Sequence, residues 1–240
     1  MNPLELAATR SRWAERNVGE KAFLFFGLIL LALTLPPVPT LPIIVVVTLV
    51  VVYRCSGQWR LYFTLCLAPL SFLAIGIIPL MLTIGTSGIE FHGDGWQQAA
   101  LVFARSTVAT AIIMGFALCT PISELIAWSI TIGMPTGLVY VIMMMYRMIT
   151  ILFSRARAMW EAQGMRLGRS RMSRWIFSSA GQAAGLFVLS INHSRRLAEG
   201  LELRAEPTAM LVVTPKRAIN LRRVAGYLVL FTLIILVTLL

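Results

Sequence analysis

The chain contains a run of 24 residues, Leu61 to Ile84, without a single charged side chain. A helix needs about 20 apolar residues to cross the hydrocarbon core of a bilayer, so this run predicts a membrane span, kinked at Pro69 and Pro79. The composition agrees, because 13% of the residues are charged, against about 25% in soluble domains. A chain of this kind is expected to place most of its helices in lipid.

Four further apolar runs complete a set of five predicted spans. They are residues 22–35, 43–53, 97–120 and 224–240. The first reaches spanning length when it is extended back to Val18, because each helical residue adds about 1.5 Å. Prolines within residues 36–42 predict a turn before the second run. To cross the membrane, this short second run must tilt, thin the bilayer locally or begin inside that turn.

Two long helix-compatible stretches, residues 135–168 and 172–204, lie between the fourth and fifth spans. Each predicts a rod of roughly 45–50 Å at 1.5 Å per residue, far longer than the average helix of about 11 residues. The first stretch begins apolar and turns basic, and the second is amphipathic. A shorter helix over residues 121–133 is predicted at the membrane interface before them.

The distribution of bases predicts the orientation of the chain. There are 21 Lys and Arg residues and a net charge of +11, but the proline-rich turn at 36–42 and a glycine-rich loop at 85–96 contain no base. The positive-inside rule therefore predicts a cytoplasmic N-terminus, an external C-terminus, and residues 119–217 in the cytoplasm or at the inner interface. Counting 138–153 as a span would place the basic stretch 155–204 outside, against this rule.

These observations predict an all-α integral membrane protein with about five transmembrane helices and two long amphipathic cytoplasmic helices that cross each other. Its parts would be an N-terminal transmembrane region with four spans (1–120), a cytoplasmic or interfacial region with two long helices (121–217) and a C-terminal transmembrane helix (218–240). The bases lie between apolar spans, so they indicate topology and contact with membrane lipid rather than binding of nucleic acid.

Small residues in the second long stretch predict where the two helices cross. Gly181, Ala184 and Gly185 belong to a small-xxx-small pattern, which lets helix backbones approach closely.

Each long stretch closes with a short motif that carries an arginine. The motifs are Ala162-Gln163-Gly164 with Arg166, and Leu203-Arg204-Ala205. A helix C-terminus favours cations, and a planar guanidinium forms bidentate pairs with a carboxylate. The arginines suit an acidic protein partner or lipid phosphates, and the residues alone leave both alternatives open.

The sequence offers little for catalysis or metal binding within this chain. It lacks a Gly-x-x-x-x-Gly-Lys-Ser/Thr loop for ATP, and His92 and His193 fall on opposite sides of the predicted membrane. The polar stretch 90–94 suits a turn better than a cation site, and Met143 to Met145 suit packing better than a soft metal. No catalytic residue and no metal ligand are therefore expected.

Arg105 interrupts the fourth predicted span, where a charge is costly. It either contacts a partner subunit or extends its side chain to the external interface. The three cysteines, Cys55, Cys66 and Cys119, are an odd number without metal or redox spacing. Those in or beside apolar spans are expected to pack as small apolar residues.

Several strings resemble the transmembrane (T) component of energy-coupling factor (ECF) importers, and within that family the cobalt branch, the CbiQ type. They are Arg12-Trp13 with Glu20-Lys21, Thr34-Leu35-Pro36-Pro37, Ala68-Pro69-Leu70-Ser71-Phe72, and the string from Ala162 to Gly168. In that family two coupling helices each end in an Ala-Arg-Gly-like motif. Here Gln163 replaces the arginine of the first motif, with Arg166 as a candidate substitute, and Arg204 keeps that of the second while both its neighbours differ.

The resemblance implies a non-catalytic scaffold of a cobalt importer in the bacterial inner membrane, with nickel as the alternative metal. Two ABC-type ATPase subunits would bind ATP and each receive one helix end, at Ala162, Gln163, Gly164, Arg166, Leu203, Arg204 and Ala205. A CbiM-like membrane subunit, with or without a small CbiN-like subunit, would bind the cobalt ion, and this chain would carry no cofactor. The alternative is a membrane-embedded assembly or sensor protein whose basic helices bind lipid without an ATPase partner.

Overall fold

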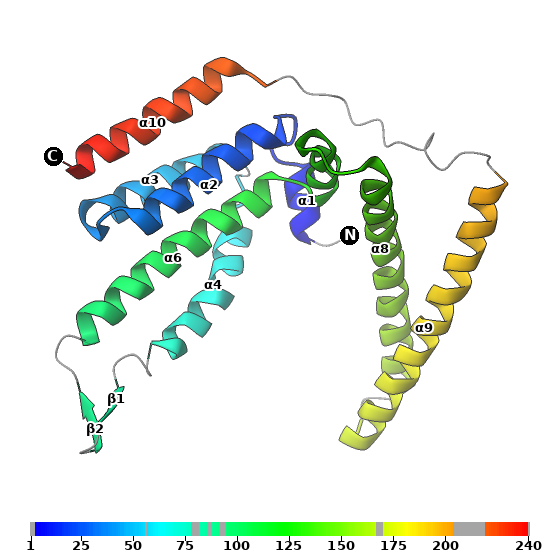
Figure 1. Cartoon of the computed structure of the whole chain (residues 1–240). Helices are drawn as coiled ribbons and strands as arrows, with labels where there is room; N and C mark the ends of the chain where they lie inside the picture. The colour runs from blue at the N-terminus through cyan, green and yellow to red at the C-terminus, as the bar shows by residue number, and fades with distance from the viewer. Residues whose placement is uncertain are drawn as a thin grey trace. The chain divides into compact units, whose positions relative to one another are not determined.

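The computed structural model describes residues 3–55, 57–77, 82–85, 88–91, 95–166, 170–203 and 219–239 (Figure 1). The chain divides into two compact units. One, called the bundle below, comprises Asn2–Leu125 and Lys216–Leu240. The other, called the long-helix unit, comprises Ile126–Pro215.

The described residues are almost entirely helical, which confirms the predicted all-α class (Figure 1). The bundle contains α1 (Pro3–Thr9), α2 (Val18–Thr34), α3 (Pro37–Cys55), α4 (Trp59–Gly76), α6 (Gly95–Cys119) and α10 (Leu221–Leu239). A short helix, α7 (Ile122–Trp128), leads into the long-helix unit, which contains the 3₁₀ turn η1 (Ser129–Ile132), α8 (Thr136–Met165) and α9 (Met172–Glu202).

The N-terminal helical hairpin forms where the sequence predicts it. Asn17 caps α2, because its side-chain oxygen accepts a hydrogen bond from the Gly19 N–H at 2.8 Å. Helix α3 begins inside the proline-rich turn: Val38 is non-helical, and Pro42 lies near the start of the regular helix, where a missing N–H costs little. The second span thereby gains its length, 19 residues.

The prediction of one continuous helix over residues 61–84 is wrong. Helix α4 ends at Gly76, and Leu82–Gly85 forms a strand, β1, which pairs antiparallel with β2 (Gly88–Phe91). Apolar length alone does not separate the two structures, because Thr and Ile favour strands and the glycines that close β1 and open β2 suit a tight turn. Pro79 lies outside the described residues.

The core of the bundle lies between α2, α3, α6 and α10. Each of these helices contributes a side chain that is at most 1% exposed: Leu28, Ile44, Ile112 and Ile234. Glycine permits the close approach of α2 and α10, because a Cβ at Gly27 would overlap the ring of Phe231. A Cβ at Gly115 of α6 would likewise lie 2.8 Å from Cγ2 of Val52 on α3.

Five helices of the described chain have the length and apolar composition to cross a membrane. These candidates are Pro37–Cys55, Trp59–Gly76, Ala99–Cys119, Thr136–Met165 and Leu221–Thr238. The predicted number is confirmed, but the set differs, because α8 is included and the 17-residue α2 is not. Large apolar side chains on the outside of α2 and α3, such as Phe26 and Val46, are 60% or more exposed, as lipid-facing residues are.

Candidate functional site on the two long helices and at the charged end of the bundle

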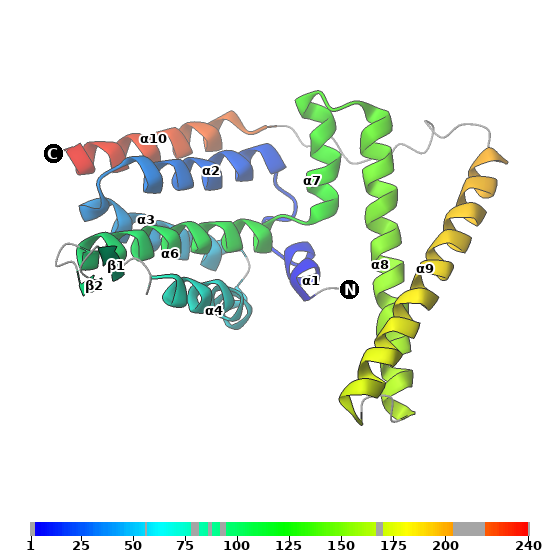
Figure 2. The same cartoon turned by 60° about the horizontal axis from the view of Figure 1, so that its bottom comes forward.

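The two long helices α8 and α9 cross within their unit (Figures 1 and 2). Their described bounds agree with the predicted stretches to within a few residues. At the crossing, Gln182 of α9 donates a hydrogen bond from Nε2 to the backbone oxygen of Ala156 on α8 at 2.7 Å. One turn away, a Cβ at Gly185 would lie 3.1 Å from Cε of Met159. Contact is therefore closest around Gln182 and Gly185.

The three small residues of the predicted crossing differ in their surroundings. Gly185 is half-buried and faces Met159 on α8. Gly181 and Ala184 are exposed, and a Cβ at Gly181 would meet no atom within 4 Å. The difference follows from helix geometry, because residues i and i+3 or i+4 share a helix face only approximately. One of them therefore lies nearer the line of contact between α8 and α9.

The end of α8 presents the first motif. The backbone N–H of Arg166 bonds to the carbonyl oxygens of Ala162 and Gly164, which closes the helix. Ala162 and Arg166 are exposed, Gln163 and Gly164 are half-buried, and Met165 is 89% exposed. A helix end with an exposed methionine and an exposed arginine is a suitable surface for a partner with an acidic, partly apolar groove.

The end of α9 is described as far as Leu203. Its N–H bonds to the carbonyl oxygen of Glu199 at 3.2 Å, and its side chain is 87% exposed. Arg204 and Ala205, the other two residues of the second motif, lie outside the described residues.

A cleft of about 340 Å³ opens between α8 and α9. Arg147 lines it from α8, and His193 and Arg196 line it from α9, together with the apolar side chains of Met144 and Met148. Met144 therefore lines a cleft between two helices, whereas Met145 is 58% exposed.

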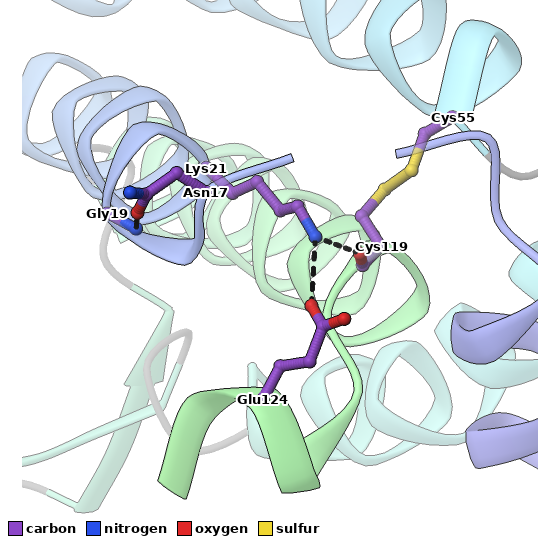
Figure 3. A network of polar contacts seen from close by, with 6 residues as sticks. All are labelled: Asn17, Gly19, Lys21, Cys55, Cys119 and Glu124. Atoms are coloured by element: carbon purple, nitrogen blue, oxygen red, sulfur yellow. Dashed lines mark hydrogen bonds and ion pairs between the residues drawn. A yellow bond between two sulfur atoms is a disulfide. The ribbon is translucent and has the colours of Figure 1, made fainter. Parts of the chain in front are cut away.

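Buried charges at one end of the bundle form a network that the sequence did not reveal. Lys21 is 1% exposed, and its Nζ donates to the carbonyl oxygen of Cys119 at 3.1 Å and lies 3.6 Å from a carboxylate oxygen of Glu124 (Figure 3). Figure 3 shows the lysine side chain extending from α2 to the point where α6 ends and α7 begins. The lysine thus connects three helices through charged and polar contacts.

The neighbouring carboxylate makes the matching contacts on the other side of α2. Glu20 is 3% exposed, and it accepts a hydrogen bond from the backbone N–H of Asn220 at 2.6 Å. Its second oxygen lies 3.5 Å from Nη1 of Arg223. Successive helical residues point about 100° apart, so Glu20 contacts the start of α10 while Lys21 contacts α6 and α7. The two adjacent opposite charges at the start of an apolar helix were the feature of the sequence from which this network could have been predicted.

Arg105 makes a contact that neither sequence alternative included. Its Nη2 donates to the carbonyl oxygen of Leu35 at 3.0 Å. Leu35 ends α2, and a helix C-terminus favours a cation. Arg105 therefore stabilises the end of α2 at the turn into α3.

The cysteines differ from expectation. Cys55 and Cys119 form a disulfide that joins the ends of α3 and α6, whereas Cys66 is free and buried. Their separation of 64 residues gave no local spacing from which to predict the pair. In the described part of the chain, no three His, Cys, Asp or Glu side chains gather at a position that could hold a metal ion.

Comparison with known proteins assigns this architecture to a family. The model of the family "CbiQ: Cobalt transport protein" matches residues 10–205. A cobalt transport protein CbiQ from Rhodobacter capsulatus is 30% identical over 216 residues, which cover 90% of this chain and 88% of the relative. The CbiQ protein of Salmonella typhimurium is 23% identical over 85% of this chain and 96% of its own length.

A third relative is named as a putative fusion protein. It is a "Putative fused cobalt transport protein CbiMQ" from Methanocorpusculum labreanum, 26% identical over 63% of this chain and 28% of the relative. The family match over most of the chain and the five apolar helices of its described part agree. This multi-pass membrane protein belongs to the CbiQ family of cobalt transport proteins, the cobalt-type T components of ECF transporters.

Proposed function

We propose that this protein is the transmembrane scaffold of an ECF-type ABC importer for cobalt ions. Two ATPase subunits bind the ends of α8 and α9, and their ATP-driven movement is transmitted through these helices to a substrate-binding membrane subunit. The observation that carries the proposal is the pair of crossed helices, 30 and 31 residues long, whose described ends are exposed. At 1.5 Å per residue each helix is about 45 Å long, so a small rotation at one end becomes a displacement of several ångströms at the other.

The contacts of Glu20 and Lys21 support a topology for this scaffold. Lys21 contacts Glu124, and Glu20 contacts Asn220. Glu124 and Asn220 therefore both lie at the end of α2 where that helix begins, and so do the two ends of the segment that joins them. The chain must therefore cross the membrane an even number of times, or not at all, between Glu124 and Asn220. Neither α9 nor the sequence that follows it has the apolar length of a span, so a single crossing by α8 would leave Asn220 on the wrong side.

The charge pattern then gives the direction. Within the described part of the bundle, the bases other than Arg105 lie at the end where α2 begins, and residues 36–42 and 85–96 contain no base. We therefore place the N-terminus and both long helices on the cytoplasmic side, where ATP-binding subunits have access to them.

The choice of partners in this proposal is supported in part by the same family. The name of the relative CbiMQ combines CbiM and CbiQ, which supports a CbiM-like subunit as the neighbour of this chain. In the proposal, that subunit holds the cobalt ion as cargo, and the ATPase subunits hold ATP. This chain contributes contacts that differ between the ATP-bound and ATP-free states, which is what coupling requires.

The docking of the ATPase subunits is tested at Arg166. Arg166→Glu places a carboxylate where an acidic groove is expected, and loss of an interfacial charge pair costs about 2–5 kcal/mol. Pull-down of the ATPase subunits with the affinity-tagged chain should fall at least tenfold, since about 1.4 kcal/mol is a factor of ten.

A matched control uses the same helix. Arg155→Glu makes the same change in charge at an exposed position of α8, 11 residues earlier in the chain, and should leave the pull-down unchanged. Wild-type retention of the ATPase by Arg166→Glu would remove Arg166 from the interface. A chain that never retains an ATPase would favour the lipid-binding sensor instead.

A further inference from the structure

An open groove of about 490 Å³ runs along the outside of the bundle between α2, α3 and α10. Its surface is mainly apolar, with valines from α3 and Leu230 from α10. Val46 and Val50 are 60% and 50% exposed. Helices α3 and α10 are both candidate membrane spans, so the groove opens toward the surrounding lipid.

Three arginines line one end of this groove. They come from separate segments: Arg16 precedes α2, Arg54 lies in the last turn of α3, and Arg223 in the first turn of α10. No Asp or Glu belongs to the described residues that line the groove. Glu20, which does not line the groove, lies 3.5 Å from Arg223 and offsets one of the three positive charges. This end of the groove therefore keeps an excess of positive charge.

Two aromatic side chains line the groove near the arginines: Trp13 beside Arg16, and Tyr227 about one turn after Arg223 on α10. The guanidinium carbon of Arg16 lies 3.9 Å above the Trp13 ring. Trp and Tyr are typical of the depth at which headgroups meet acyl chains. From Arg54 to Val46 the groove extends along α3 by eight residues, or about 12 Å at 1.5 Å per residue, into the apolar part of the span.

We propose that this groove binds one anionic phospholipid of the bilayer. Its phosphate lies among Arg16, Arg54 and Arg223, and an acyl chain lies against the valines of α3. Guanidinium groups pair with phosphate through parallel N–H donors, and basic pockets at the cytoplasmic side of membrane helices suit lipid headgroups. A lipid there would fill the outer seam between α3 and α10.

Gly226 provides the space for the lipid and the means to test it. It lines the groove, and a Cβ added there would meet no atom within 4 Å. Gly226→Leu should therefore fold normally while it fills the groove. Gly137→Leu is the matched control, because a Cβ at Gly137 also meets nothing within 4 Å and this residue lies on α8.

The test measures lipid retained by the full chain purified in detergent, by native mass spectrometry. The probes are phosphatidylglycerol and phosphatidylcholine with identical acyl chains. Wild type should retain phosphatidylglycerol in at least about a fivefold excess, the factor expected for a single base near an anionic headgroup. Gly226→Leu should lose this lipid and Gly137→Leu should keep it. Equal retention of both lipids by wild type, or unchanged retention by Gly226→Leu, would overturn the proposal.

A second pair of variants keeps the test valid should Gly226→Leu fail to give a monodisperse protein. Arg54→Gln should lower retention of phosphatidylglycerol about fivefold. Arg60→Gln, which removes an exposed base of α4 outside the groove, should not. Equal effects of the two substitutions would indicate general attraction to an anionic surface and contradict a defined site.

Two further experiments identify the molecule that is bound in the groove. Millimolar inorganic phosphate should not displace the lipid, because it lacks the acyl chain that the valines bind; displacement would reassign the arginines to a free phosphate. A photoreactive amino acid in place of Val50 should cross-link to lipid in whole membranes. A cross-link to another protein chain would show that a partner helix fills the groove instead.

Discussion

At the scale of single residues, the bundle uses two adjacent opposite charges on two faces of one helix. Glu20 fixes the start of α10 through Asn220 and Arg223, and Lys21 fixes the junction of α6 and α7. A buried charge is costly unless it is paired and hydrogen-bonded. Both residues meet that condition, so they specify which helices lie at this end.

Lys21→Met tests the network. It leaves the Glu124 carboxylate without its lysine, and because Glu124 is 25% exposed, we expect a loss of roughly 1–3 kcal/mol rather than the full cost of a broken buried pair. The melting temperature in detergent should fall by several degrees. Adding Glu124→Leu should recover most of the loss, since an apolar pair of similar shape is often tolerated. A single substitution as stable as wild type would show that the pair is dispensable.

At the scale of elements, the two long helices make their closest described contact around Gln182 and Gly185. A Cβ at Gly185 would press on the flexible end of Met159, which can move, whereas a larger side chain would force the backbones apart. In the proposed function, this crossing determines how movement at one helix end reaches the other.

Gly185→Leu should therefore separate α8 from α9, and Gly181→Leu should not, because Gly181 faces open space. The measurement is the yield of a disulfide between cysteines introduced at Ala156 and Gln182, in a chain without its own cysteines. We expect a severalfold lower yield in the Gly185→Leu variant than in the Gly181→Leu variant. Equal yields from both variants would contradict the described crossing.

The spacing of apolar residues and the positions of helix-breaking prolines and glycines were sufficient to predict most of these helices. Helices α8 and α9 fall within residues 135–168 and 172–204, because long stretches without internal proline have few alternatives to a helix. Residues 61–84 were misassigned, since apolar length does not distinguish a span from a shorter span followed by a hairpin. The contact of Arg105 with Leu35 and the pair Cys55–Cys119 join residues far apart in sequence, and only tertiary packing brings these together.

At the scale of the whole molecule, the two units of the chain have different tasks in the proposed function. The bundle is held in lipid by apolar helices and pinned at one end by buried charges. The described ends of the long helices are exposed, and in the proposed function they bind cytoplasmic partners. Neither part contains catalytic machinery in the proposal, so transport depends on whether the helix ends are bound and moved by another protein.

The most direct measurement of this claim is the distance between spin labels at Gln163 and Leu203, near the two helix ends, in the assembled complex within lipid. We predict that both labels become immobile when the ATPase subunits bind and that the distance between them changes by several ångströms when ATP is added. Labels that remain mobile in the complex, or a distance that is the same with and without ATP, would contradict the account.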